Sequence, residues 1–290
     1  MFQKVKKVKS RASAYIIPAE TRQKLVKSIV RSKLAYKNPA DVHEIWEKSR
    51  QRDCVVASSD KYNSRYYKEL ENVVDAPICH TNVVSGQFAY TWKNMDEDIL
   101  YITYRGTESI QNILADINVT TEELNDGIMV HEGFYKNFIS ISQSIELEIL
   151  KSRVSRLVIS GHSLGGGLSQ IAAAHYGEKF PLKEITCHTF GCPRSGNFAF
   201  TQWFAKNVKD YVRVVNKDDP VTFVPQRPVW QHVCHDCIVI TDALECSLEL
   251  TDVPWYWRMW CMLTTTKMMT TIKDHDCDVY ISRLIGSEQL

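Results

Sequence analysis

Ser163 stands in a sequence context that can make its hydroxyl a nucleophile. Residues 161–165 read Gly-His-Ser-Leu-Gly. They follow the apolar run 156–160, which predicts a buried strand, and precede the small-residue stretch 166–174, which predicts a tightly packed helix. A serine on such a strand-to-helix turn is held in a strained backbone conformation that pushes its hydroxyl out of the sheet. Only glycines fit two positions to either side of it, so the pattern predicts a catalytic serine.

The same turn can stabilise negative charge. The N-terminus of the predicted helix presents unpaired N–H groups and a partial positive charge where an oxyanion would form. The alternative is a glycine-rich helix cap without chemistry, and the strand before the motif together with the helix after it favours the nucleophile.

A serine nucleophile needs a histidine to take its proton, and that imidazole needs a carboxylate to fix its tautomer. In α/β-hydrolases the chain order is Ser, acid, His. Three histidines follow the next plausible acid, and two of them, His232 and His235, precede or lie within the last predicted strand. We therefore choose His275 as the base.

The acid lies in the loop after the predicted strand 211–215, which reads Asn-Lys-Asp-Asp-Pro. Asp218 and Asp219 both lie where this topology needs a carboxylate, and their spacing alone does not separate them. A solvated Asp-Asp-Pro turn is the alternative without a chemical role.

The elements that must position these residues alternate between strand and helix patterns. This alternation predicts an α/β fold with a mainly parallel central sheet, helices on both faces and an antiparallel opening hairpin. We expect a basic tail and helical extension over 1–40 and the main domain over 41–290. The predicted helices are 20–36, 41–49 (capped by Asp41), 136–151, the helix after Ser163 and 197–208, and the predicted strands are 82–92, 98–104, 156–160, 185–190, 211–215 and about 233–241.

Composition limits the classes of function. The formal net charge of +1 over 290 residues gives no general attraction to nucleic acid. No run of 18 apolar residues is present, which predicts no transmembrane segment. The basic N-terminus lacks the apolar core of a signal peptide, and the nine cysteines are odd in number and irregularly spaced. We therefore expect an intracellular, cytoplasmic protein, with peripheral contact to a lipid surface, and leave the oligomeric state open.

The segment from Cys234 to Cys237 reads Cys-His-Asp-Cys and could suggest a zinc site. A structural zinc site needs four ligands, however, and this segment leads directly into an apolar strand with no second Cys-x-x-Cys after it. We expect buried thiols there, no metal and no cofactor.

Five further segments carry recognisable motifs. They are Tyr-Arg-Gly-Thr-Glu-Ser at 104–109, His-Glu-Gly-Phe at 131–134, Phe-Gly-Cys-Pro-Arg-Ser-Gly-Asn at 190–197, Val-Asn-Lys-Asp-Asp-Pro-Val at 215–221 and Asp-His at 274–275. Together with the serine motif they resemble the fungal-type (class 3) triacylglycerol lipases of the α/β-hydrolase fold, over roughly residues 87–281. The first 40 or so residues have no counterpart in that resemblance.

The resemblance implies a role for each motif. It puts the triad acid on Asp219, beside Ser163 and His275, and forms the oxyanion hole from the N–H groups of Thr107 and Leu164 with the Thr107 hydroxyl. It implies a serine hydrolase acting on acyl lipids at a membrane or lipid-droplet surface, with an acylglycerol lipase as the leading function. The alternatives are a phospholipase A1 and a non-catalytic lipid-binding relative.

Residues 110–117 carry aliphatic side chains along one stripe of a predicted short helix, at Ile110, Ile113, Leu114 and Ile117. Such a stripe can simply pack on a core. Its position matches the lid of the resembled family, which covers the active site and exposes its apolar face to lipid. A second apolar run, at 255–260, could line an acyl groove, lie at a membrane interface or be buried in the core.

Overall fold

The structure of the 290-residue chain is a computed structural model. The residues it describes are 14–15, 17–50, 61–71, 73, 75–82, 84–94, 97–107, 120–216, 219–225, 229–233, 236–240, 246–250 and 272–286.

A nine-stranded sheet forms the centre of the molecule, in the order β1-β11-β10-β9-β8-β7-β4-β3-β2. Its five middle strands, β4 and β7 to β10, are parallel, and the strands at both edges pair antiparallel. The strands are β1 (Ala14–Tyr15), β2 (Ile78–Asn82), β3 (Gln87–Lys93), β4 (Ile99–Tyr104), β7 (Arg156–His162), β8 (Glu184–Phe190), β9 (Asp210–Asn216), β10 (Asp236–Ile240) and β11 (Cys246–Leu250), and a separate pair comprises β5 (Thr121–Glu123) and β6 (Met129–His131).

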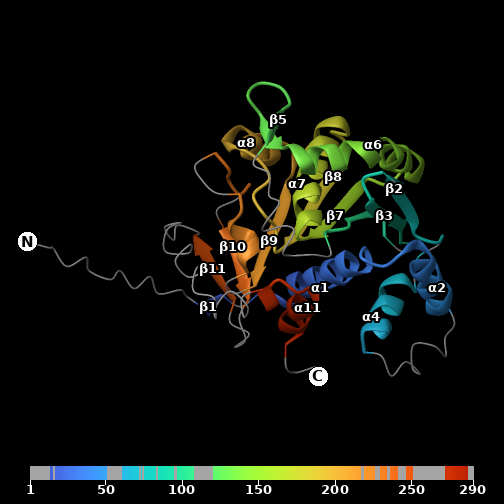
Figure 1. The fold of residues 1–290 in the computed structure, drawn as a ribbon. Coiled ribbons are helices and arrows are strands. Elements are labelled where there is room, and N and C mark those ends of the chain that lie inside the picture. The colour runs from blue at the N-terminus through green and yellow to red at the C-terminus, as the bar shows by residue number, and fades with distance from the viewer. Residues whose placement is uncertain are drawn as a thin grey trace, which may run out of the picture.

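Helices cover both faces of this sheet (Figure 1). Helices α6 (Glu132–Ser152), α7 (Leu164–Lys179) and α8 (Phe198–Asn207) lie on one face, and α1 (Ala19–Leu34) and α11 (Cys277–Ile285) lie on the other. Helices α2 (Pro39–Ser49) and α4 (Lys61–Leu70) pack beside α1. The predicted α/β architecture with a mainly parallel, doubly covered sheet is confirmed.

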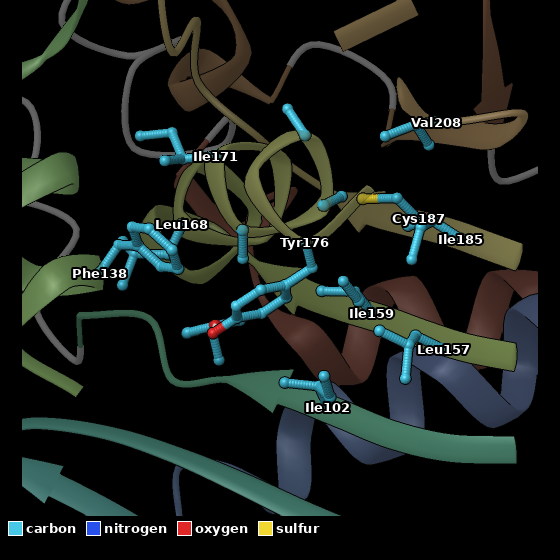
Figure 2. Packing of buried hydrophobic residues seen from close by; sticks show 14 of the residues in the cluster. Ile102, Phe138, Leu157, Ile159, Leu168, Ile171, Tyr176, Ile185, Cys187 and Val208 are labelled. Atoms are coloured by element: carbon cyan, nitrogen blue, oxygen red, sulfur yellow. The ribbon is translucent and has the colours of Figure 1, made fainter. Parts of the chain in front are cut away.

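The two faces have separate apolar cores, because successive side chains of a strand point to opposite sides. In β4, Leu100 and Ile102 join the core under α7, whereas Ile99 and Tyr101 join the core under α1. Figure 2 shows the α7 side, where side chains of β4, β7 and β8 meet Leu168, Ile171 and Tyr176. Burial on both faces explains why these strands are almost continuously apolar.

Helix α1 is part of this packing. Its Leu25 and Ile29, four residues apart on one face, are fully buried in the core that also contains Tyr280 and Leu284 of α11. The Lys33 ammonium forms an ion pair with Asp278 of α11. The division at residue 40 stays a prediction, and the helix assigned to the extension lies directly on the sheet.

Several elements differ from the sequence predictions. The strand predicted over 82–92 begins only at Gln87, because the chain turns at 84–86 with Gly86 at φ +65°, and Asn82 is the last residue of the separate strand β2. Helix α2 begins at Pro39, and its cap is Asn38 rather than Asp41, because the Asn38 side chain accepts the Asp41 N–H at 2.9 Å. Helices α4 and α11 and strand β11 were not predicted, and β11 follows the strand expected to be last.

Two buried histidines make the stability of the fold sensitive to pH. Burial lowers the pKa of His188, in β8, to about 4, and burial lowers the pKa of His80, in β2, to about 4 as well. An unfolded histidine titrates near pH 6.5. Between about pH 6.5 and 4 the unfolded state therefore binds more protons than the folded state, and the free energy of unfolding falls as pH falls.

We expect each of these histidines to cost on the order of 3 kcal/mol of stability by about pH 4. His188→Asn, which keeps an acceptor for Ser28 Oγ (2.8 Å away), should reduce the loss measured by urea unfolding between pH 7.5 and 5. His43→Asn, on the exposed face of α2, is the matched control and should keep the parent's pH dependence. An unchanged pH dependence in His188→Asn would contradict this assignment.

Candidate active site

Ser163 occupies the turn between β7 and α7, as the motif predicts. Its backbone adopts φ +60° and ψ −131°, a conformation rarely accessible to a residue with a side chain. A Cβ on Gly161 would lie 2.1 Å from the Gly165 carbonyl oxygen, and a Cβ on Gly165 would lie 2.3 Å from that of Tyr104. The backbone approaches too closely here for side chains at either glycine, and this close approach holds the serine in its strained geometry.

Asp219 and His275 form a buried hydrogen-bonded pair. His275 Nδ1 lies 2.9 Å from Oδ1 and 2.8 Å from Oδ2 of Asp219, and the two side chains are 1% and 0% exposed. A carboxylate can only accept, so Nδ1 carries the proton and Nε2 presents a lone pair. Asp219 also accepts the Val221 N–H at 3.0 Å and the Tyr280 hydroxyl at 2.7 Å, and burial beside the Asp219 charge raises the pKa of Tyr280.

The turn that carries His275 is fixed to the end of β9. The Asn216 side-chain amide donates to the Asp274 carbonyl at 2.6 Å. Arg283 of α11 donates to the Asp274 carboxylate at 3.1 Å and also binds the Asn216 side chain. The last residue of β9 therefore holds the segment before His275, while Asp219, three residues further along, binds the imidazole.

Ser163 and His275 are linked through neighbouring backbone. The Ser163 N–H donates to the Phe190 carbonyl at 2.9 Å. A Cβ on the next residue, Gly191, would lie 2.6 Å from Asp219 Oδ2 and 2.9 Å from His275 Nδ1. Ser163 Oγ and His275 Nε2 are both buried, and neither has a hydrogen-bond partner among the described residues. The geometry thus leaves one hydroxyl donor and one imidazole acceptor unpaired in the same region.

Thr107 lies beside the same turn. It follows β4, which runs parallel to β7, and a Cβ on Gly165 would lie 3.0 Å from the Gly106 nitrogen. Leu164 is the first residue of α7, so its N–H belongs to the unpaired N-terminal turn of that helix. A cavity of about 400 Å³ is lined by Thr107 and His275, together with Lys33, Tyr36, Lys37, Tyr66, His162, Asp276 and Cys277.

Sequence reasoning missed four residues that contact this machinery. Tyr280 binds Asp219, Gly191 packs against the Asp–His pair, His162 donates to the His275 backbone, and Tyr36 binds His162. His162 and Gly191 lie inside recognised motifs and could have been examined there. Tyr36 and Tyr280 give no local signal, because only tertiary packing brings them to the site.

Other predicted features lie outside the described residues. They are the lid residues Ile110, Ile113, Leu114 and Ile117, the competing acid Asp218, the aromatic run 255–260, and Cys234 with His235 of the possible zinc site. Within the ranges that the structure describes, no group of His, Cys, Asp and Glu side chains could hold a metal ion. Within the same ranges, Cys79 and Cys277 are free thiols.

A parallel sheet with a serine on a strained strand-to-helix turn and a buried Asp–His pair at its carboxyl edge defines an α/β-hydrolase. The comparison with protein families agrees. Residues 101–229 match the family described as lipase (class 3), which confirms the resemblance of the motifs to that family.

Individual relatives match the chain over less than half of its length. The chain is 28% identical to a secreted mono- and diacylglycerol lipase of Fusarium solani over 49% of its own length and 44% of that protein. It is 30% identical to a chloroplastic phospholipase A(1) of Arabidopsis thaliana over 43% of its length and 33% of that protein. The chain therefore spans less than half the length of these relatives.

The fold matches that of the Rhizomucor miehei triacylglyceride lipase, with a TM-score of 0.69 at 20% identity over 89% of this chain and 94% of that one.

The predicted intracellular, cytoplasmic location is wrong. The Fusarium solani relative is secreted by its name, which conflicts with that prediction. The prediction relied on an odd and irregularly spaced set of cysteines and on an N-terminus without the apolar core of a signal peptide. Neither determines the compartment, because buried free thiols pack as small apolar groups wherever a protein is found.

Gly191 offers a direct test of the Asp219–His275 geometry. It has φ +56° and no room for a Cβ, whereas Gly86 has φ +65° and nothing within 4 Å of an added Cβ. Alanine at either position meets the same backbone strain, about 1–2 kcal/mol. Only at position 191 would the new methyl group displace Asp219 or His275.

We expect Gly191→Ala to lower the rate of ester hydrolysis by about tenfold or more, since a misplacement near 1 Å can cost this much. Gly86→Ala should lose comparable backbone stability and keep its rate. The measurement is hydrolysis of a soluble p-nitrophenyl ester by folded protein. Equal rates in the two variants would show that the Gly191 contact does not position the pair.

Proposed function

We propose that this protein is a serine hydrolase that cleaves carboxylic esters of acyl lipids, with Ser163 as nucleophile, His275 as base and Asp219 as acid. The observation that carries the proposal is the buried Asp219–His275 pair together with a buried serine on a strained turn, because neither His275 Nε2 nor Ser163 Oγ has a partner among the described residues. An unpaired buried acceptor and an unpaired buried hydroxyl are costly to stability, and catalysis explains why both are kept.

The reaction follows from the protonation states. His275 Nε2 takes the hydroxyl proton as Ser163 Oγ attacks the ester carbonyl, and Asp219 stabilises the imidazolium that forms. The tetrahedral intermediate collapses as His275 gives that proton to the departing alcohol. Water then attacks the acyl-enzyme with His275 again as base, which releases the fatty acid and restores the serine.

The oxyanion of each tetrahedral intermediate would be bound by the N–H groups of Thr107 and Leu164 and by the Thr107 hydroxyl. Both residues flank Ser163, one on the loop after β4 and the other at the start of α7. The unpaired N–H groups and the partial positive charge of the α7 N-terminus add to this stabilisation.

For the substrate we propose an acylglycerol. The Fusarium solani relative is named a mono- and diacylglycerol lipase, and the similar Rhizomucor miehei structure is a triacylglyceride lipase. The apolar stripe of residues 110–117 is proposed as a lid that opens at a membrane or lipid-droplet surface. None of the described helices is both long enough and apolar enough to cross a bilayer.

A phospholipase A1 is the second candidate, favoured by the similarity to the Arabidopsis thaliana phospholipase A(1). Hydrolysis of triolein, monoolein and phosphatidylcholine, compared at equal interfacial area, separates the two candidates. Release of fatty acid mainly from phosphatidylcholine would replace the acylglycerol proposal.

Ser163→Ala tests the nucleophile. We expect a fluorophosphonate probe to label the parent protein once, at Ser163, and the variant not at all, with hydrolysis lowered by about 10⁴-fold or more. Ser169→Ala, a buried serine on the same helix whose Oγ donates to the Gly165 carbonyl at 2.7 Å, is the control and should remain labelled. Labelling that persists in Ser163→Ala would overturn the assignment and favour a non-catalytic lipid-binding protein.

Thr107→Ala tests the oxyanion hole. Loss of one such donor costs about 2.7–4 kcal/mol of transition-state stabilisation, so we expect turnover to fall by about 100-fold or more while the fold survives. The check is kcat for a soluble ester, with circular dichroism as the measure of folding. Unchanged turnover would remove the Thr107 hydroxyl from the site.

A further inference from the structure

A chain of hydrogen bonds connects helix α1 to the backbone of His275. The Tyr36 hydroxyl, two residues beyond the end of α1, lies 3.0 Å from His162 Nδ1. His162 Nε2 lies 2.7 Å from the carbonyl oxygen of His275. The rings of His162 and His275 lie with their centroids 4.5 Å apart. The residue that precedes Ser163 therefore contacts both the catalytic histidine and a tyrosine from the N-terminal region.

The direction of each bond is fixed by its acceptors. A backbone carbonyl can only accept, so Nε2 of His162 carries a proton and donates it to His275. Burial and the neighbouring His275 hold the pKa of His162 well below its usual value, so the ring is neutral. In a neutral imidazole the other nitrogen is an acceptor, and Nδ1 must receive the Tyr36 hydroxyl proton. The Tyr36 hydroxyl thus fixes the tautomer that His162 needs in order to hold His275.

Tyr36 also contacts the segment that carries Thr107. A Cβ on Gly106 would lie 2.1 Å from the Tyr36 hydroxyl oxygen and 2.6 Å from the His162 carbonyl oxygen. The hydroxyl thus occupies the space that a side chain at position 106 would fill. Tyr36, Thr107, His162 and His275 all line the 400 Å³ cavity. The Tyr36 hydroxyl therefore contacts both His162, which binds His275, and the segment at Gly106 that leads to Thr107.

We propose that Tyr36 is a positioning residue for the hydrolysis reaction, which holds His275 through His162 and the oxyanion segment through Gly106. The inference rests on the proposed function of Ser163, Asp219 and His275. Asp219 fixes the imidazole of His275 at Nδ1, and the Tyr36–His162 pair fixes the same residue at its carbonyl, so the base is held at two points. A base held in this way loses less orientational freedom when it must meet Ser163 Oγ.

The main test is Tyr36→Phe, which removes only the hydroxyl. We expect kcat for p-nitrophenyl butyrate to fall by about tenfold, the effect of one lost hydrogen bond made to an orienting group, with little change in KM. Rates are expressed per active site titrated with a fluorophosphonate, so that a loss of folded protein does not mimic a loss of positioning. Tyr90→Phe is the matched control, because the Tyr90 hydroxyl donates to the Lys37 carbonyl at 2.8 Å, next to Tyr36. It should keep the parent's kcat per site.

A double-mutant cycle tests the route through His162. The amide of His162→Gln can still donate to the His275 carbonyl, and it has no tautomer for a tyrosine to fix. In this background the further change Tyr36→Phe should lower kcat clearly less than in the parent, since only the contact with Gly106 remains to be lost, so the two substitutions should be non-additive.

The outcomes are distinct. Equal kcat per titrated site in Tyr36→Phe and the parent overturns the positioning role, and so does a change in KM alone. A full tenfold loss in the His162→Gln background overturns the route through His162. If the parent is neither labelled at Ser163 nor active, the proposed function itself fails, and this inference fails with it.

Discussion

The site depends on the burial of one carboxylate. Asp219 is fully buried, and a buried charge is tolerated only where hydrogen bonds replace the water that it has lost. Three donors do so: the Val221 N–H in its own turn, the Tyr280 hydroxyl from α11 and the Nδ1–H of His275. The requirement that all three meet at one point fixes where α11 and the turn before it must lie on the end of the sheet. Removal of any one donor would leave the remaining charge under-solvated.

The serine is held by a different constraint, the close packing of backbone. At residues 161 and 165 the strand and helix approach until no side chain fits, and the positive φ of Ser163 follows from this approach. Electrostatics therefore positions His275, and close backbone packing positions Ser163. The residue Tyr36, just beyond helix α1, joins the two, because it contacts His162 on one side and the Gly106 backbone on the other.

The difference between local and distant information explains what the sequence could predict. The turn at Ser163 is specified by five adjacent residues, and the alternation of strands and helices shows as a change in hydrophobic periodicity. Both could therefore be predicted from the sequence. The choice between Asp218 and Asp219 could not be predicted from spacing, because the two carboxylates are adjacent in the chain. The family resemblance was needed to favour Asp219. Tyr36 and Tyr280 reach the site through packing across the whole chain. The turn at 84–86 was missed because the two valines at 83–84 extend the apolar pattern of β3 towards the N-terminus.

The place of α11 has a consequence for biosynthesis. Helix α11 comes after the Ser163 turn, the parallel strands and Asp219 in the chain. During synthesis, His275 and Tyr280 therefore emerge from the ribosome more than 50 residues after Asp219. A nascent chain can therefore form its sheet before Asp219 has His275 and Tyr280 to bind it. At that stage the apolar face of α1 is also not yet covered by α11. Under the proposed mechanism, ester cleavage cannot begin until translation has passed α11. The growing polypeptide is therefore inactive at the stage when its uncovered apolar surface makes it most prone to aggregate.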